Sequence, residues 1–386
     1  MFPRSKNVLC FFALLCSPTL AAQEAAQPGW TFAEEQLRPF WQGEVMEGES
    51  VLFIKDEKTG EARASVLFPI QKLLSVRSAS AEVPYEEGRD YVWKAGSREI
   101  VIPRGSRIVT STPDALRRPA KSQPHQLTHR DGNGEIYFGG KLEYHELQTI
   151  VRYSHAPNLW TSPVPKFDPK ALPLSVRKLR GREPLKIVVL GDSISTGCNA
   201  SGWAGGKPFQ PAYPELLSRL LHETYKGQVE VTNLSVGGMD SAWGVTMVDK
   251  VVEAGPDLVL LAFGMNDSGG RSAQDFQEKI AATMKGIREK RHEAEFILVA
   301  TMVGNPDWVA LKPELFPQYR DALAKLCGPG VALADVTSIW SAFLKLKKDW
   351  DQTGNGVNHP NDFGHRVYAQ VISSLLIPNG EPAGVK

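Results

Sequence analysis

The second half of the chain alternates apolar runs with amphipathic segments, and this pattern restricts the possible folds more than any other feature. The apolar runs of strand length are LKIVVLG, VEVTNLS, DLVLLAFG, EFILVATM and VALADV. Helical spacing is found at about 211–225, 240–254, 272–291, 313–327 and 362–376. Near-continuous apolar strands joined through helices predict an α/β fold with a parallel sheet covered on both faces. In such sheets, ligand sites form beyond the carboxyl ends of the strands.

The first half carries a different pattern. From Trp30 to about Ser154, short β-branched and aromatic runs are separated by Gly, Pro and Asp, as in SVLFI, REIVIP, SRIVTS and QTIVRYS. This pattern predicts an all-β sandwich domain over residues 30–156. Residues 157–183 are rich in proline and basic residues and predict a linker. The α/β domain is therefore expected to span residues 184–380.

The N-terminus has two early cations, an apolar run from Val8 to Cys16, and small residues at Ala21 and Ala22. This is typical of a secretory signal peptide over residues 1–22, with an uncleaved anchor as the alternative. We therefore expect export to the periplasm or the extracellular space. Outside this segment the cysteines are Cys198 and Cys327, which predict either one disulfide or two buried thiols.

Charge and apolar content exclude some partners. The chain has 44 Lys and Arg against 43 Asp and Glu, so it offers no electrostatic reason to bind nucleic acid or an anionic membrane. No stretch after the N-terminal apolar run has the length of a membrane helix. We therefore expect no stable membrane insertion.

Four polar segments fall just beyond predicted strand ends, and each offers a group that acyl transfer needs. Gly191-Asp192-Ser193 would present a hydroxyl and an amide, NLSVGG ends in Gly238, and GMND presents the Asn266 side chain. His359 precedes a proline at the start of the last predicted helix and supplies a base. Together the four segments predict one site at the carboxyl edge of the sheet.

These four blocks, in this order from Leu185 to about Ile377, resemble the SGNH branch of the GDSL hydrolase family. The resemblance implies a three-layer α/β domain and a Ser193 nucleophile with His359 as its general base. It also implies an oxyanion hole made by the Ser193 and Gly238 amides and the Asn266 side chain. Neither a cofactor nor a metal ion is expected.

One position departs from that family's pattern. The family places an aspartate three residues before the histidine, where it orients the imidazole, but this chain has Gly356 there. Three alternatives follow: a backbone carbonyl from residues 354–358 holds the ring; a displaced acid such as Asp351 or Asp335 does so; or the protein is inactive. The presence of all four motif residues favours the first two.

A serine activated by an imidazole, with preorganised donors for the oxyanion, favours ester hydrolysis because an alkoxide leaves easily. Exported two-domain members of this family often deacetylate carbohydrates, so the resemblance implies a carbohydrate O-acetylesterase acting on a small-molecule or polysaccharide ester. Trp203, Phe209 and Tyr213 follow the serine and are candidates to stack on a sugar. The alternatives are a lipid esterase or lysophospholipase, and a non-catalytic glycan-binding protein. A metallohydrolase is disfavoured because His359 and His365 would point to different sides of a helix.

Overall fold

The computed structural model describes residues 30–378, and its C-terminal part is built on a five-stranded sheet. The strands are β10 (Leu185–Gly191), β11 (Val229–Asn233), β12 (Leu258–Ala262), β13 (Glu295–Ala300) and β14 (Val331–Asp335). Their order is β11-β10-β12-β13-β14, and every neighbouring pair is parallel. All five coincide with predicted apolar runs, so the predicted α/β fold with a parallel sheet is confirmed.

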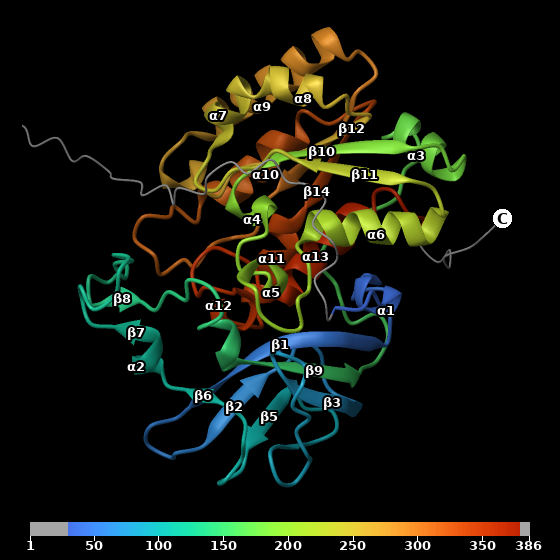
Figure 1. The fold of residues 1–386 in the computed structure, drawn as a ribbon. Helices are drawn as coiled ribbons and strands as arrows, with labels where there is room; N and C mark the ends of the chain where they lie inside the picture. Colours follow the sequence, from blue (N-terminus) through green and yellow to red (C-terminus); the bar gives the residue numbers. More distant parts are fainter. Residues whose placement is uncertain (1–29, 379–386) are drawn as a thin grey trace, which may run out of the picture.

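Each segment with helical spacing contains at least one helix. These helices are α6 (Tyr213–Tyr225), α7 (Ser241–Thr246), α8 (Val248–Glu253), α9 (Ala273–Lys290), α10 (Leu315–Ala324) and α13 (Asp362–Ser373). Helices outside those segments include α3 (Pro173–Arg180), α11 (Val336–Leu344) and α12 (Asp349–Gln352). In Figure 1, α7, α8 and α9 lie on one side of the strands, and α6, α11 and α13 lie on the other.

Alternate residues along β10, β12, β13 and β14 enter two different apolar clusters. Ile187 and Val189 of β10 pack with residues of α6, α11 and α13. Val188 and Leu190 pack with residues of α8, α9 and α10. This division follows from the period of two along a strand. Both sets are buried, which is why the run contains almost no polar residue.

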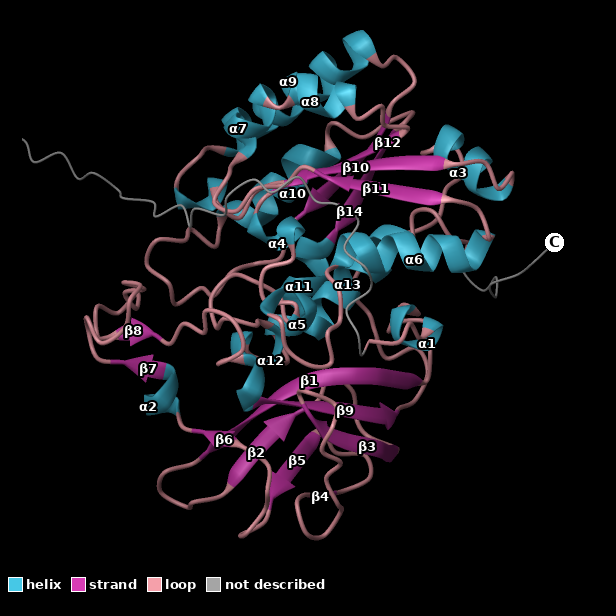
Figure 2. Ribbon diagram, in the orientation of Figure 1, coloured by secondary structure: helices cyan, strands magenta, loops and turns pink. Residues whose placement is uncertain are grey.

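The N-terminal part is rich in strands, as Figure 2 shows below the helices of the α/β part. A seven-stranded sheet has the order β3-β9-β1-β2-β5-β4, with β6 paired to β1. Its strands are β1 (Val45–Lys55), β2 (Ala62–Ser65), β3 (Lys72–Ser78), β4 (Val92–Trp93), β5 (Glu99–Ile102), β6 (Thr110–Ser111) and β9 (Gln148–Ser154). Two short helices, α1 (Glu34–Leu37) and α2 (Pro113–Leu116), accompany them.

Between β6 and β9 the chain leaves this sheet and approaches the C-terminal part (Figure 1). It forms a small pair of strands, β7 (Arg117–Arg118) and β8 (Glu135–Ile136). Leu127 and Ile136 then pack against Val357, and the Gly139 amide donates to the Asn355 carbonyl at 3.2 Å. We call residues 137–144, the part of this excursion that reaches the His359 loop, the strap.

The segment expected to be a linker contains helix α3. Val176 and Leu179 of this helix are buried, and the Leu174 and Ser175 amides donate to the Glu295 carboxylate at 2.7 and 2.8 Å. Two effects stabilise α3 although its sequence shows only weak helical periodicity. Its two apolar residues are buried, and the Glu295 carboxylate lies at its N-terminus. The expected signal peptide lies outside the described residues. Within residues 30–378, no helix combines the length and apolar character needed to cross a bilayer.

The β-rich and α/β parts share one continuous apolar core, to which Val51, Phe53 and Tyr153 contribute from strands and Trp340 and Phe343 from α11. A buried ion pair crosses the same boundary. Lys347 and Glu49 are both fully buried and in direct contact, and Lys347 also donates to the Ser50 and Ser65 carbonyls at 3.1 and 3.0 Å.

Replacing Lys347 by Met should lower the free energy of unfolding by about 3–5 kcal/mol, because the Glu49 charge stays buried without its cation. Adding Glu49→Gln should recover much of this loss. The control Arg152→Ala removes an exposed pair with Glu47 and should cost less than about 1 kcal/mol. Urea unfolding followed by tryptophan fluorescence measures all three, and an unchanged midpoint for Lys347→Met would contradict this role of the pair.

Candidate active site

Ser193 lies at the carboxyl end of β10, as the first residue of the one-turn helix α4 (Ser193–Thr196). The Asp192 side chain caps this helix by accepting from the Ile194 amide at 3.0 Å. Gly191 is required at the strand end, since a Cβ there would lie 2.5 Å from Ser195 Oγ and 2.6 Å from the Ala262 carbonyl oxygen. The strand end therefore holds the Ser193 hydroxyl in a fixed position.

His359 reaches Ser193 from the loop before α13. Its Nε2 lies 2.9 Å from Ser193 Oγ, which is a hydrogen-bonding distance. The loop is shaped by Asn355, whose Oδ1 accepts from the Val357, Asn358 and His359 amides at 2.9 to 3.2 Å. The two residues predicted to act as nucleophile and base are thus brought together by elements 166 positions apart.

The other ring nitrogen of His359 faces a residue that the sequence analysis did not select. His359 Nδ1 lies 2.7 Å from Oδ1 of Asn199, which is almost fully buried in the loop after α4. Asn199 adopts a left-handed backbone conformation (φ 65°), which asparagine tolerates better than most residues. Ser193, His359 and Asn199 therefore form one hydrogen-bonded chain.

The opposite end of the Asn199 amide is surrounded by carbonyl oxygens. Four of them lie 3.1 to 3.5 Å from Nδ2: those of Gly139, Gly140, Lys141 and Gly354. Only the NH₂ end of an amide can donate to carbonyls, so Oδ1 must face the ring. Oδ1 accepts only, and His359 therefore carries its proton on Nδ1 and leaves Nε2 free to accept from Ser193.

The strap also explains why position 356 carries no acid. Gly356 has φ 80°, and a Cβ there would lie 2.6 Å from the Tyr137 carbonyl oxygen and 2.7 Å from Cε2 of Tyr144. An aspartate would need both a strained backbone and the space that these two residues fill. The family's usual support for the histidine is therefore sterically excluded in this chain.

Neither acid considered from the sequence contacts His359. Asp351 is buried at the boundary with the β-rich part, where it accepts from the Leu52 amide at 2.8 Å. Asp335 caps α11 by accepting from the Ser338 amide at 2.8 Å. The contact to Nδ1 comes from a side chain, so the backbone-carbonyl alternative is wrong as well.

The two remaining predicted residues lie on neighbouring loops that are tied together. Gly238 has φ 80° and no heavy atom within 4 Å of a Cβ placed on it, and for the adjacent Gly237 a Cβ would lie 3.7 Å from Cβ of Ser193. Asn266 Nδ2 donates to the Met239 carbonyl at 2.8 Å. The loops beyond β11 and β12 are thereby held together beside the serine, with open space at Gly238.

A buried acid reinforces this link. Asp267 accepts from the Ser241 hydroxyl at 2.6 Å and from Arg271 Nε at 2.6 Å, and Arg271 also binds Asp240. This network joins the residue after Asn266 to the loop that follows Gly238. The network thereby holds the Gly238 amide and the Asn266 side chain in place. Preorganised hydrogen-bond donors are suited to an oxyanion because they need not reorient during reaction.

Electrostatics keep the base neutral. Loss of contact with water around the imidazole, and secondarily the nearby His365, lower the pKa of His359 to about 3. The imidazole is then unprotonated at neutral pH, the form able to accept a proton from Ser193. Because Asn199 is uncharged, no carboxylate lies against the ring to raise this pKa again.

Several other candidates have structural roles. His365 is buried, with Nδ1 3.4 Å from the Tyr213 amide, and Tyr213 is itself buried against Ser195, so it cannot stack on a sugar. Trp203, in contrast, is 40% exposed. Cys198 contacts Thr196 and Cys327 contacts Leu323, without a disulfide in the described structure. No group of three metal-ligating side chains occurs within residues 30–378.

Comparison with known proteins agrees with this geometry. Residues 189–367 match the model of the GDSL-like Lipase/Acylhydrolase family. This part of the chain carries a domain of that family. No curated protein matches the chain.

Similar solved structures include a two-domain esterase (CEX) active on acetylated mannans, 21% identical over 54% of this chain and 53% of that chain, with a TM-score of 0.43. The lipase Lip_vut3 from a goat rumen metagenome is 16% identical over 49% of this chain and 96% of that chain, with a TM-score of 0.41. A lipase/acylhydrolase from Enterococcus faecalis is 21% identical over 49% and 93%, with a TM-score of 0.38. The match thus spans about half of the two-domain esterase.

The role of Asn199 can be tested through the pH dependence of kcat/KM for an aryl acetate. In the unaltered protein, kcat/KM should begin to fall on the acid side of the profile (the acid limb) only well below pH 6.5, because the pKa of His359 is lowered. Asn199→Asp places a carboxylate beside Nδ1, favours the imidazolium, and should move the acid limb up by about 1–3 pH units.

Asn199→Ala should lower kcat/KM at least about tenfold at neutral pH, because nothing then selects the Nδ1 tautomer. Asn133→Ala, at an exposed turn, is the matched control and should change nothing. An acid limb that stays in place in Asn199→Asp would contradict the assignment of Asn199.

Proposed function

We propose that the protein is a serine esterase that removes acetyl groups from carbohydrates. The observation that carries the proposal is the chain of hydrogen bonds from Ser193 Oγ through His359 to Asn199 Oδ1. These hydrogen bonds also argue against the alternative of a non-catalytic protein. A protein that had lost its activity would have no selective pressure to keep the three side chains aligned.

In the proposed mechanism, Ser193 Oγ attacks the ester carbonyl carbon while its proton passes to Nε2 of His359. The negative charge on the carbonyl oxygen is met by the Ser193 and Gly238 amides and the Asn266 side chain. His359 then protonates the leaving alkoxide, which gives an acyl-enzyme on Ser193. A water molecule, deprotonated by the same nitrogen, releases the acid and restores the serine.

Asn199 orients the imidazole in this mechanism without stabilising its charge as a carboxylate would. A neutral partner therefore gives the correct tautomer but less help to the imidazolium formed during attack. Esters with good leaving groups demand least from such a base, which favours them over amides.

The surface near the serine favours a substrate with a short acyl group. On the segments next to Ser193, the exposed large apolar side chains are single ones, Trp203 and Val236. A long acyl chain would need a continuous apolar surface to leave water. Trp203, 40% exposed, offers a flat face to a sugar instead.

We also propose the following organisation. Residues 30–156 form a β-sandwich accessory domain, residues 157–183 connect it, and residues 184–380 form a three-layer hydrolase domain. The two apolar clusters on the parallel sheet support the layered arrangement. The proposal of export to the periplasm or the extracellular space rests on the pattern of residues 1–22.

Substitutions at the serine and the oxyanion donors test the mechanism. Ser193→Ala should abolish hydrolysis of an aryl acetate, and Asn266→Ala should lower kcat by about 10²- to 10³-fold with little change in unfolding temperature. A chelator should have no effect. Full turnover by Ser193→Ala would exclude the mechanism, and loss of turnover with chelator would indicate a metallohydrolase instead.

Acyl-chain length tests the substrate class. With aryl esters from acetate to octanoate, kcat/KM should be highest for acetate and fall steadily with length. Acetylated oligosaccharides should be deacetylated by the unaltered protein and not by Ser193→Ala. A maximum at octanoate would favour the lipid esterase over the carbohydrate esterase.

A further inference from the structure

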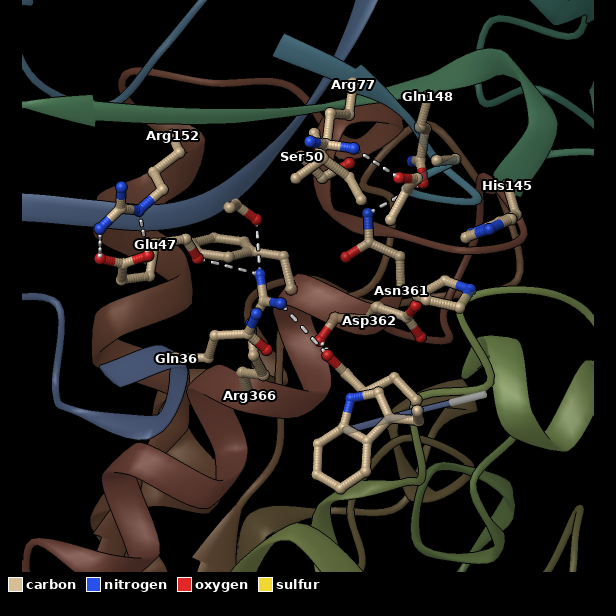
Figure 3. Close-up of a pocket in the computed structure, with 18 of the residues that line it drawn as sticks. Gln36, Glu47, Ser50, Arg77, His145, Gln148, Arg152, Asn361, Asp362 and Arg366 are labelled. Atoms are coloured by element: carbon tan, nitrogen blue, oxygen red, sulfur yellow. Dashed lines mark hydrogen bonds and ion pairs between the residues drawn. The ribbon is translucent and has the colours of Figure 1, made fainter. Parts of the chain in front are cut away.

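A cavity lies on the boundary between the β-rich and α/β parts, apart from Ser193. Its volume is about 440 Å³, within the range of small-molecule sites. Strands β1, β3 and β9 form one wall, and the first turns of α13 form the other (Figure 3). Ser193, His359 and Asn199 do not line it.

Arg366 is the central charged group of this cavity. Its side chain is almost fully buried, and its guanidinium donates to Gln210 Oε1 at 3.2 Å and to the Glu47 and Gly48 carbonyls. Its Nε has no hydrogen-bond partner within the described chain, and no carboxylate of residues 30–378 forms an ion pair with it. The pKa of Arg366, which burial lowers to about 10, still leaves it charged at neutral pH.

Two further lining groups have unused hydrogen-bonding capacity. Ser50 Oγ and Asp362 Oδ2 are both buried and have no partner among the described residues. Asp362 uses only its other oxygen, which accepts from the Ser201 amide at 2.7 Å. Buried polar groups without partners are unfavourable, so these atoms favour a ligand that both donates and accepts.

The charge balance of the cavity argues against a simple anion site. Glu47 and Arg152 pair with each other across 2.6 Å. Among the other charged residues that line the cavity, Arg366 and Arg77 are positive and Asp362 is negative. A phosphate or carboxylate attracted by the arginines would meet the Asp362 carboxylate at close range.

The uncharged lining groups point to a polyhydroxylated ligand. Among the side-chain amides that line the cavity, those of Gln148, Gln210 and Asn361 already bond to other groups of the chain, which leaves the Gln36 amide to donate to and accept from a ligand. Trp30 adds one apolar aromatic surface. Sugar hydroxyls donate and accept, while the C–H face of a sugar ring is apolar.

We propose that this cavity is a second saccharide site, which holds a sugar unit of the carbohydrate substrate away from Ser193. The inference rests on the proposed function for its substrate class. Anchoring one unit of a polymer raises the effective concentration of neighbouring esters at Ser193. The β-rich part, which supplies Trp30, Ser50 and Arg77, would then contribute directly to substrate capture.

The cavity is linked to the loop that carries Asn199. Asp362 accepts from the Ser201 amide, and the Ser201 hydroxyl accepts from the Gln210 amide at 2.9 Å. Asn361 lies two positions after His359 and donates to the Gln148 side chain at 3.0 Å. Residues that line the cavity thus hold the backbone on both sides of the Asn199–His359 contact.

Calorimetric titration of the Ser193→Ala protein with mannopentaose, cellopentaose and xylopentaose tests the site. At least one should bind at micromolar to millimolar concentrations. Adding Trp30→Ala, or separately Ser50→Val, which fills part of the cavity, should weaken that binding at least fivefold. Adding Val92→Ala, at an exposed residue of β4 that does not line the cavity, serves as the control and should leave the affinity unchanged.

With Ser193 present, Trp30→Ala and Ser50→Val should retain the kcat/KM for an aryl acetate and the unfolding temperature, but lose activity on acetylated polymer. Absence of pentasaccharide binding, or binding unaffected by both cavity variants, would overturn the second site and leave the esterase intact. Cavity-dependent binding without aryl acetate turnover would support the site while overturning the proposed function.

Discussion

The contact between the Asn199 side chain and His359 is the interaction on which the catalytic arrangement depends. One end of this amide meets four backbone carbonyls, and the other accepts from the imidazole. An amide is polar at both ends, so fixing its NH₂ group among acceptors fixes its oxygen as well. The orientation of His359 toward Ser193, and in the proposed mechanism the activation of the Ser193 hydroxyl, follow from that single constraint.

Three of those four carbonyls belong to the strap, which the β-rich part contributes. The strap also fills the space next to Gly356, where related enzymes place their acid. The same segment thus excludes the usual support of the histidine and provides its replacement. The shared apolar core and the buried Lys347–Glu49 pair hold the strap's parent sheet against the α/β part. The β-rich part is therefore integral to the active site.

Much of this structure could be predicted from the sequence because its determinants are local. The parallel strands are continuous apolar runs, and Ser193, Gly238, Asn266 and His359 follow strand ends or precede a helix. Asn199 could not be found in this way, since it lies 160 positions from His359 and its role depends on carbonyls of a third segment. Helix α3 was missed for a similar reason, because its N-terminus is stabilised by Glu295, which is 120 positions away.

The most direct test of this account is the position of the proton on the neutral imidazole of His359, read from ¹⁵N chemical shifts of histidine-labelled protein near pH 7. The account predicts that Nδ1 carries the proton and that Nε2 has the shift of an unprotonated ring nitrogen, with a mixture of tautomers in Asn199→Ala. A proton found on Nε2 in the unaltered protein, or a spectrum unchanged by Asn199→Ala, would contradict it.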